Sequence, residues 1–410
     1  MKRPASALRT LVLIWLGWFI VLYAFQAIAP LRLNLRRPDT AVEWAAHETT
    51  ANSQNNKPYL LDPFMNRQVS WDSEYYIGIA LAGYADPAAR TVPHPDTGEP
   101  IQSNYAFFPL YPLLMRTLLP ALRPFNLTPI GAATLAGVIV ALAGTLGGLI
   151  ALYDLARDDL EHDGALRAVF YLLIFPSGFF LAQVYTEGLF IGLAFGALAL
   201  GRRGQWVRAS LLAALATLTR AHGAALALPL VIFWLSRVDR ARPLREQLSW
   251  RWAAQGLLAL APLAVYLAWR LSPLGQNWAA VQADYFQRGL FAWTRSLYNW
   301  RRALEYAQTT RPALVYYGVE LGALAAATLA GLALLRRQPA VALFSLAVVV
   351  LSAFSGVAQS MSRYVLVAPA TYLALARLGR APAFDRTWTL ISALTMGVSA
   401  MLFSFDLWVG

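Results

Sequence analysis

Cysteine is absent from this 410-residue chain, and histidine occurs only four times. Without cysteine the chain has no disulfide scaffold, and four scattered histidines argue against a zinc cluster. The HExxH, CxxC and Walker-type phosphate-loop motifs are also missing from the sequence. Redox chemistry and ATP-driven pumping are therefore not expected.

Charged residues are also scarce: they make up 14% of the chain, whereas 58% of residues are hydrophobic. The mean hydropathy is +0.47. Soluble domains carry about 25% charged residues, so this composition indicates an all-α polytopic membrane protein. Apolar stretches recur to the C-terminus, and the first, 11–29, is expected to be a retained span rather than a cleaved signal. We expect residues 1–410 to form one integral membrane domain.

Basic residues predict which side of the membrane each loop faces. The 34 basic residues exceed the 22 acidic ones, giving a net charge of +12, mostly in short loops between apolar segments. This pattern favours the positive-inside rule over nucleic-acid binding. The clearest cytoplasmic markers are Arg202, Arg203, Arg208, Arg237, Arg240, Arg242, Arg245, Arg251, Arg336, Arg337, Arg377 and Arg380. They share one side if about eleven spans cross the bilayer, near 11–29, 131–153, 166–181, 188–200, 207–219, 224–236, 252–270, 313–335, 339–355, 364–376 and 387–405.

The same threading places two large loops, 30–130 and 271–312, on the outer side. Within the first loop, residues 106–122 are apolar, but counting them as a span would reverse the side of every later basic marker. We therefore expect an interfacial helix there, and a second one near 75–80 from its apolar spacing. Loop 271–312 has the pattern of an interfacial helix pair.

Ionisable residues that are far apart in sequence converge on the outer face. They are Asp72, Glu187, Arg220, His222 and Arg363. Charged groups near the membrane are costly, so such a cluster indicates a functional site.

The two carboxylates each allow two interpretations. Asp72 follows Trp71 at the start of an expected helix, where it is either a general base in an aromatic setting or a helix cap. Glu187 lies beside Tyr185 in a short outer turn, where it is either part of a hydrogen-bonding site or a loop carboxylate that faces water.

The arginines also allow two interpretations. Arg220 and His222 lie between two short apolar segments, where an arginine is tolerated if it lines a cavity or pairs internally. The guanidinium fork of Arg220 matches phosphate oxygens, although a structural pair with Glu187 or another carboxylate is the alternative. Arg363 is a second candidate phosphate ligand, with anchoring of a helix end as its alternative.

Several of these residues lie in motifs that match a known family. The motifs are Trp71-Asp72, Ala-Leu-Ala-Gly-Tyr at 80–84, the aromatic-proline run 106–112, Phe175-Pro176-Ser177 with Tyr185-Thr186-Glu187, and Thr219-Arg220-Ala221-His222-Gly223. In their order and spacing they resemble the PIG-V (GPI mannosyltransferase 2) family of GT-C glycosyltransferases. The resemblance ends near residue 225, and the rest of the chain is similar mainly in topology. The family prefers Ser-Glu and Arg-Ser-Asn-Gly where this chain has Thr186-Glu187 and the 220–223 motif, a departure that bears on the acceptor.

The resemblance implies the GT-C fold and sugar transfer from a polyprenyl-phosphate hexose, usually mannose, on the non-cytoplasmic face. It implies Asp72 as the base of a single inverting displacement, with Glu187 orienting hydroxyl groups. Arg220 and Arg363 would bind the donor phosphate. Trp71, Tyr185 and His222 are the expected substrate-binding residues. No metal ion or other cofactor is expected, because a lipid monophosphate donor needs a metal less than a nucleotide diphosphate does.

The expected partners are the lipid bilayer, the polyprenyl-phosphate sugar and an acceptor that is a lipid, a glycan or a protein. The Ala, Leu and Arg bias is typical of bacteria, so we expect a multi-pass protein of the bacterial plasma membrane with its active site on the outer face. A eukaryotic acceptor does not carry over to such a host. One alternative is a protein or cell-wall-glycan glycosyltransferase of the same fold. Another is a lipid-linked sugar transporter, which is disfavoured because transporters typically have related halves and no internal repeat is visible.

Overall fold

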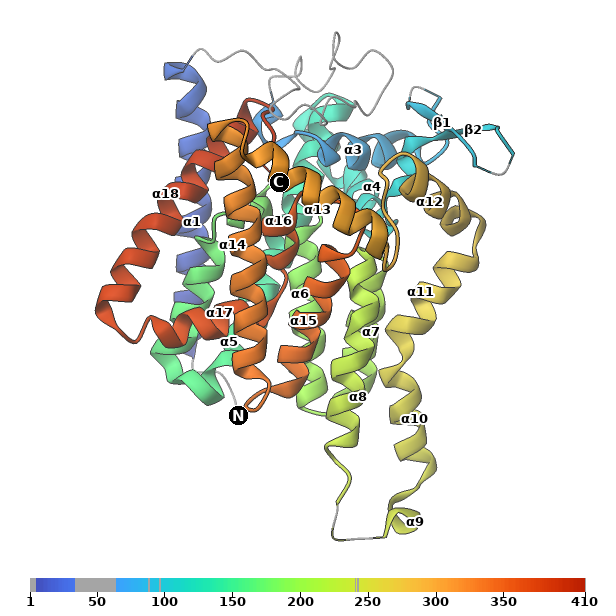
Figure 1. Cartoon of the computed structure of the whole chain (residues 1–410), viewed down its shortest axis with the longest axis vertical. Helices are drawn as coiled ribbons and strands as arrows, with labels where there is room; N and C mark the ends of the chain where they lie inside the picture. Colours follow the sequence, from blue (N-terminus) through green and yellow to red (C-terminus); the bar gives the residue numbers. More distant parts are fainter. Residues whose placement is uncertain are drawn as a thin grey trace.

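The computed structural model describes residues 5–33, 64–87, 89–95, 97–239, 241 and 243–409. Nearly all regular structure in these residues is helical (Figure 1). In one small antiparallel hairpin, β1 (Thr91–Pro93) pairs with β2 (Pro100–Gln102) so that Val92 lies opposite Ile101. The predicted all-α class is confirmed.

The helices are numbered as in Figure 1. The first half of the chain contains α1 (Ala5–Arg32), η2 (Asn66–Gln68), α3 (Asp72–Ala82), η3 (Ser103–Ala106), α4 (Leu110–Leu122), η4 (Arg123–Phe125), α5 (Pro129–Leu173), η5 (Gly178–Ala182) and α6 (Glu187–Arg202). The middle contains α7 (Trp206–Thr217), η6 (Ala221–Leu226), α8 (Ala227–Leu235), α9 (Leu244–Gln247), α10 (Trp250–Ala259), α11 (Ala261–Leu271) and α12 (Pro273–Asp284). The last part contains α13 (Trp293–Ala307), α14 (Arg311–Leu334), α15 (Pro339–Ala353), α16 (Met361–Val365), α17 (Pro369–Leu378) and α18 (Pro382–Ser404).

Helix length and composition support a multi-pass membrane protein. In the described part of the chain, α1, α5, α14 and α18 are long and apolar enough to cross a bilayer. The pair α10 and α11 is a further candidate, bent by 51° at its break. Shorter apolar helices are α7, the η6–α8 segment and α15. The predicted number of about eleven crossings is not confirmed.

Prolines and one backbone break explain where the helices depart from the predicted spans. Within α5, Glu161 has non-helical dihedral angles (φ 61°, ψ −169°), so two helices meet there. The second of them ends at Leu173 rather than at 181, because Pro176 has no backbone N–H to continue the helix. The predicted span 364–376 is likewise divided into α16 and α17, and α17 begins at Pro369.

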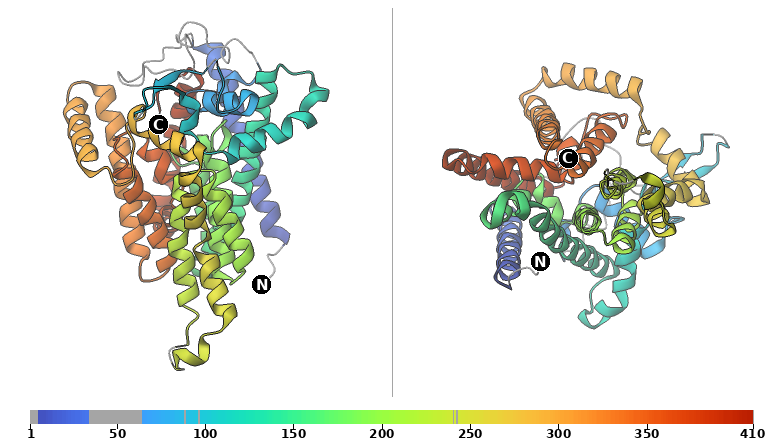
Figure 2. Two further views of the ribbon diagram at one scale, coloured as in Figure 1. Left: turned by 90° about the vertical axis from the view of Figure 1, so that its right-hand side faces the viewer. Right: turned by 90° about the horizontal axis from the view of Figure 1, so that it is seen from below.

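The two ends of the bundle differ in character. The connections α6–α7, α8–α10 and α14–α15, which carry predicted cytoplasmic arginines, lie at the lower end in Figure 1. The predicted interfacial segments form α3, α4, α12 and α13, and these helices lie with the β1–β2 hairpin at the upper end (Figures 1 and 2). Residues 34–63 of the predicted first outer loop fall outside the described residues.

Helices α5 and α6 approach each other closely through glycines. A Cβ on Gly144 would lie 2.6 Å from the Gly188 carbonyl oxygen, and one on Gly148 would lie 2.7 Å from the Ile191 side chain. Glycines at these positions allow the two backbones to meet, as small residues do in many membrane helix pairs. Because α6 begins at Glu187, this contact fixes the position of the Glu187 backbone relative to α5.

Candidate active site

Helix α3 presents Asp72 in its first turn. Trp71 is the N-cap and has a positive φ of 56°, so Asp72 is one residue inside the helix and does not cap it. The Asp72 N–H donates to the Tyr185 hydroxyl over 3.3 Å, and that hydroxyl donates to the Ser70 carbonyl over 3.0 Å. These backbone contacts hold the start of α3 and leave the Asp72 carboxylate to other partners.

Four charged side chains of alternating sign follow one another at this site. Arg363 in α16 donates to the Asp72 carboxylate over 2.7 Å and lies 3.6 Å from the Glu187 carboxylate. Glu187, at the start of α6, also forms an ion pair with Arg220, the N-cap of η6. The Glu187 and Arg363 side chains are 1% and 4% exposed, so loss of either would leave a buried charge. The sequence left open whether Arg220 pairs with Glu187, and the structure shows this pair.

The environment fixes two protonation states at this site. Burial disfavours the charged form of Arg363, yet Asp72, with Tyr364 and Glu187, keeps the pKa of its guanidinium well above the usual value. Burial, followed by the charge of Asp72, raises the pKa of the Tyr185 phenol well above its usual value. Arg363 thus remains a cation, and Tyr185 keeps the proton that it donates to Ser70.

Glu320 holds the segment that carries Arg363. This glutamate lies inside the apolar helix α14 and is 1% exposed. Its carboxylate accepts hydrogen bonds from the backbone N–H groups of Ser360 (2.9 Å) and Ser362 (2.6 Å) at the start of α16. Ser360 adopts a left-handed conformation with φ 65°, which these bonds stabilise. The sequence analysis missed Glu320, although a carboxylate within an apolar span is a recognisable signal of function.

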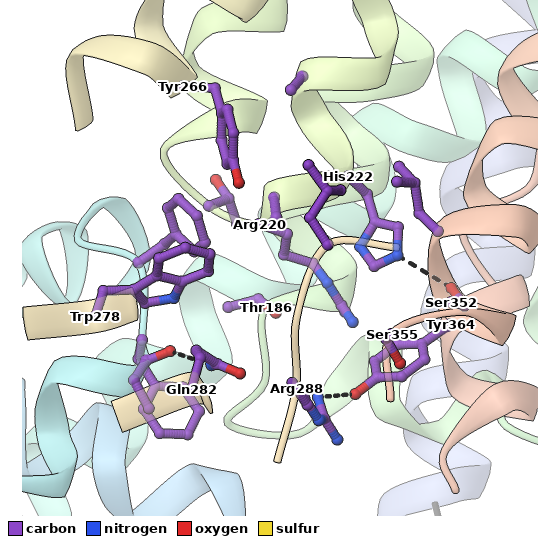
Figure 3. A pocket seen from close by; sticks show the side chains of 18 of the residues that line it. Thr186, Arg220, His222, Tyr266, Trp278, Gln282, Arg288, Ser352, Ser355 and Tyr364 are labelled. Atoms are coloured by element: carbon purple, nitrogen blue, oxygen red, sulfur yellow. Dashed lines mark hydrogen bonds between the residues drawn. The ribbon is translucent and has the colours of Figure 1, made fainter. Parts of the chain in front are cut away.

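A cavity of about 650 Å³, here called the first cavity, opens beside the ion pairs. Asp72, Glu187, Arg220, His222 and Arg363 all line it. The remaining wall is largely apolar and includes Phe108, Leu263, Trp278 and Leu290. In Figure 3, Arg220, His222, Arg288 and Tyr364 lie around this space. Arg220 and His222 come from the start of η6, whereas Arg288 and Tyr364 come from two other segments of the chain. His222 is hydrogen-bonded through Nε2 to the Ser352 hydroxyl at 3.0 Å.

Arg288 is a third arginine at the site that the sequence analysis did not select. Its guanidinium hydrogen-bonds the Tyr364 hydroxyl and lies 5.4 Å from the centre of that ring. The guanidiniums of Arg220 and Arg363 each lie 5.3 Å from the same ring. Among the described residues Arg288 has no carboxylate within ion-pairing distance, whereas the other two arginines do. Three cations therefore face two carboxylates, which leaves the site positively charged.

A second cavity, of about 630 Å³, also has Asp72 in its lining. Asp72, Arg288 and Arg363 line both cavities. The wall of the second cavity is rich in aromatic residues, which are Trp71, Tyr75, Tyr285, Phe286, Tyr306, Tyr317 and Trp408. Among the described residues of its lining, Asp72 is the one acidic side chain.

The structure brings together site residues that are far apart in the sequence, and the paired Asp72 and Arg363 are 291 positions apart. Of the predicted site residues, Asp72, Glu187, Arg220, His222 and Arg363 line the first cavity, and Trp71 lines the second. Tyr185 lines neither cavity. It lies behind Asp72, where its hydroxyl supports the backbone of α3.

The carboxylates of the site are engaged by arginines. In the described part of the chain, no three His, Asp or Glu side chains are grouped as metal ligands. Arg363 contacts both Asp72 and Glu187. The guanidiniums of this site suit the binding of an anion.

Comparison with known proteins connects this site to a family. The family model described as Mannosyltransferase (PIG-V) matches residues 19–236, which is more than half of the chain. The chain belongs to the PIG-V mannosyltransferase family. The matched region contains Asp72, Glu187, Arg220 and His222, and the predicted resemblance to the PIG-V family is confirmed.

Curated relatives of the PIG-V family match the same region. GPI alpha-1,6-mannosyltransferase 2 of Mus musculus is 31% identical over 167 residues, covering 40% of this chain and 31% of that protein. The Cricetulus griseus protein of the same name is 33% identical over 168 residues, with the same coverage. The match thus spans about a third of the length of these relatives.

Among solved structures, the chain is similar to ArnT from Cupriavidus metallidurans, whose crystal structure contains undecaprenyl phosphate. The sequence identity is 16% and the TM-score is 0.45, and the match covers 86% of this chain and 75% of ArnT.

Proposed function

We propose that this protein is an inverting glycosyltransferase that moves a hexose, which we take to be mannose, from a polyprenyl-phosphate sugar to an acceptor hydroxyl. The observation that carries the proposal is that Asp72, oriented by Arg363, lies between two cavities. A transferase needs a base that reaches two substrates at once. Membership of a mannosyltransferase family supports this activity and this sugar.

The first cavity suits the donor. Its apolar wall accommodates an isoprenoid chain, and its arginines accommodate a phosphate, because the guanidinium fork matches phosphate oxygens. Arg220 and Arg363, the predicted phosphate ligands, are each already paired with a carboxylate. Arg288 adds a third cation, whose charge is not neutralised by the carboxylates of Asp72 and Glu187.

The chemistry requires few groups. Asp72 accepts the proton of the acceptor hydroxyl as its oxygen attacks C1 of the sugar. The bond between C1 and the phosphate oxygen breaks, and its electron pair stays on the phosphate. Attack opposite this leaving group inverts the anomeric centre. The arginines stabilise the charge that grows on the phosphate in a site largely shielded from water, and no acid is needed for this leaving group.

The remaining residues orient the substrates. Glu187 Oε2 is buried and has no hydrogen-bond partner in the described part of the chain, so it can accept a bond from a sugar hydroxyl. His222 lines the donor cavity, and Trp71 lines the second cavity. In this mechanism no step requires a metal or another cofactor.

We place the active site on the non-cytoplasmic face of a multi-pass protein, in a bacterial plasma membrane. The upper end carries the interfacial helices α4, α12 and α13, whereas the basic connections lie at the lower end (Figure 1). The positive-inside rule supports the lower end as the cytoplasmic one.

The test is donor turnover by purified protein in nanodiscs, given polyprenyl-phosphate mannose with labelled sugar and a membrane extract as acceptor source. We expect Asp72→Asn to keep donor affinity and to reduce turnover by about 10²- to 10⁴-fold. The matched control is Asp284→Asn, since Asp284 is exposed and lines neither cavity.

Two outcomes would contradict the proposal. Failure of the wild-type protein to bind the donor would remove the polyprenyl-phosphate assignment. Movement of intact donor across a liposome membrane, with no sugar transfer, would identify a lipid-linked sugar transporter instead.

A further inference from the structure

We infer that Gln26 is a positioning residue, which holds Asp72 and Glu187 at the separation that the site requires. This inference rests on the proposed function and goes beyond it, because Gln26 lies in α1 and lines neither cavity. Gln26 acts through two other glutamines, Gln68 and Gln183, which lie in the segments that lead to the two carboxylates.

The side-chain amide of Gln26 uses its full hydrogen-bonding capacity. Its Nε2 donates to Gln183 Oε1 over 3.3 Å and to Ser404 Oγ over 3.2 Å. Its Oε1 accepts from Gln68 Nε2 over 3.2 Å and from Gln183 Nε2 over 3.3 Å. An amide has two donor hydrogens and an oxygen with two lone pairs, and all four are used here.

Burial makes this network costly to break. Gln26 and Gln183 are fully buried, and Gln68 is nearly so. Gln26 also lies within Ser6–Ala29, a candidate membrane span in α1. Because water is scarce at membrane depth, an amide that lost its partners there would remain unpaired. A buried network in which every group is satisfied fixes the side chains that form it.

The two outer glutamines lie at equal distances along the chain from the two carboxylates. Gln68 precedes Asp72 by four positions, and Gln183 precedes Glu187 by four. Such short segments leave little slack, because each residue extends the chain by at most about 3.6 Å. A displacement of either glutamine is therefore passed on to its carboxylate.

The segments that lead from the glutamines to the carboxylates are also joined to each other. The Val184 N–H donates to the Gln68 carbonyl over 3.1 Å. Further along, the Tyr185 hydroxyl donates to the Ser70 carbonyl over 3.0 Å. Together with the network at Gln26, these bonds hold residues 68–72 and 183–187 side by side.

The C-terminal helix α18 reaches the same segments. Ser404 accepts a hydrogen bond from Gln26, and Ser70 Oγ donates to the Phe403 carbonyl over 2.9 Å. Helices α1 and α18 pack against each other at one edge of the bundle (Figure 1). Among the described residues of these two helices, none lines either cavity. The network therefore links two peripheral helices to the site.

The separation of the carboxylates matters because one guanidinium serves both. Arg363 donates to Asp72 over 2.7 Å and lies 3.6 Å from Glu187. If the two segments moved apart, Arg363 could contact only one carboxylate, and Asp72 would lose its orientation toward the substrates. Loss of the Gln26 amide should therefore affect turnover more than binding of the donor.

The experiment removes the amide and keeps the length of the side chain. Gln26→Met makes this change, and Ser210→Ala is the matched control. Ser210 is buried, lines neither cavity and donates to the Leu258 carbonyl over 2.6 Å, so this variant also loses a buried hydrogen bond between helices. Each protein is studied in nanodiscs by backbone hydrogen–deuterium exchange, thermal unfolding and donor turnover.

We expect Gln26→Met to raise hydrogen exchange by about tenfold in residues 66–72 and 183–187, the effect of losing a buried hydrogen bond, and to leave exchange in α13 within twofold. Ser210→Ala should leave both segments unchanged. Gln68→Met keeps the pair of Gln26 and Gln183, so it should loosen 66–72 more than 183–187. This second variant also tests the inference if Gln26→Met fails to fold.

In the turnover assay, we expect kcat of Gln26→Met to fall by about tenfold while KM for the donor stays within twofold. The donor is polyprenyl-phosphate mannose with labelled sugar, and the membrane extract again supplies the acceptor. A residue with only a structural role would shift the unfolding midpoint without this split between kcat and KM.

Two results would overturn the inference: unchanged exchange in both segments of the glutamine variants, or faster exchange there with an unchanged kcat. Absence of turnover by the wild-type protein would count against the proposed function alone, because exchange is measured without donor. The exchange pattern would then decide by itself whether Gln26 holds the two segments.

Discussion

Arg363 Nη1 donates a hydrogen bond to Asp72 Oδ2 over 2.7 Å, although the two residues are 291 positions apart in the sequence. The pair joins α16 to α3 and orients the carboxylate that lines both cavities. Its geometry depends on the short helix α16, whose first turn is held by Glu320. The arrangement of the candidate base is therefore controlled by a glutamate in a different helix.

Substitution of Glu320 tests this control. Glu320→Gln retains one side-chain oxygen but turns an NH₂ group toward a backbone N–H. One of the two hydrogen bonds to the carboxylate is therefore lost, and a hydrogen bond to a charged group contributes about 1.5–3 kcal/mol. We expect kcat to fall by about tenfold while KM for the donor changes by less than twofold. Glu305→Gln is the control, since Glu305 is exposed on α13 and lines neither cavity. An unchanged kcat would show that α16 keeps its position without Glu320.

Arg288 should dominate recognition of the donor phosphate. Arg288→Gln removes the guanidinium that has no carboxylate partner among the described residues, and we expect polyprenyl phosphate binding to weaken by about 10- to 100-fold. Arg288→Lys keeps the charge without the fork of donors, so its loss should be intermediate. Arg295→Gln serves as the control, because Arg295 is exposed and lines neither cavity. Equal affinities for wild type and Arg288→Gln would assign the phosphate to other residues.

The buried pair of Glu187 and Arg220 should show strong energetic coupling. Either Glu187→Gln or Arg220→Gln leaves a buried charge and should lower the free energy of unfolding by about 3–5 kcal/mol. The double variant should lose less than the sum, with a coupling energy of about 0.5–3 kcal/mol. The exposed pair Arg301 and Glu305 on α13 provides the matched cycle, where about 0.3–0.5 kcal/mol is expected. Additive effects at the buried pair would show that the two side chains do not depend on each other.

Close packing of α5 on α6 should tolerate no added methyl group. Gly144→Ala would force a Cβ against the Leu189 and Gly188 backbone, and we expect a loss of about 1–3 kcal/mol in unfolding free energy. Gly318→Ala in α14 meets nothing within 4 Å and should be neutral or stabilising by up to about 1 kcal/mol. Thermal unfolding in nanodiscs compares the two. Equal midpoints would show that α6 can shift away from α5.

Much of the fold could be predicted because the relevant signals are local. The interfacial helices α4 and α12–α13 follow from apolar patterning combined with the side that the basic residues assign to each loop. The helix ends at Leu173 and at α16 could not be predicted as well, because one proline is enough to end a helix inside an otherwise uniform apolar run.

The candidate site was predictable only in part. Ionisable residues are rare in this chain, so Asp72, Glu187, Arg220, His222 and Arg363 were recognisable by type and by position at one membrane face. Arg288 was not, because it lies in a loop with four other arginines and has no local feature that separates it from them. Tyr185 was expected to contact substrate, but its place behind Asp72 depends on how α3 packs, which no local pattern encodes.

The sequence by itself determined that this is a helical membrane protein of a mannosyltransferase family, with its rare charged residues gathered at one face. Composition and the spacing of apolar residues are properties of short segments, so they can be read from the sequence without knowing which helices contact each other. Only the tertiary structure decided that Arg363 pairs with Asp72, that Arg288 lacks such a partner in the described chain, and that Asp72 lies between two cavities. These relations depend on long-range packing and on the high cost of leaving a buried charge without its partner.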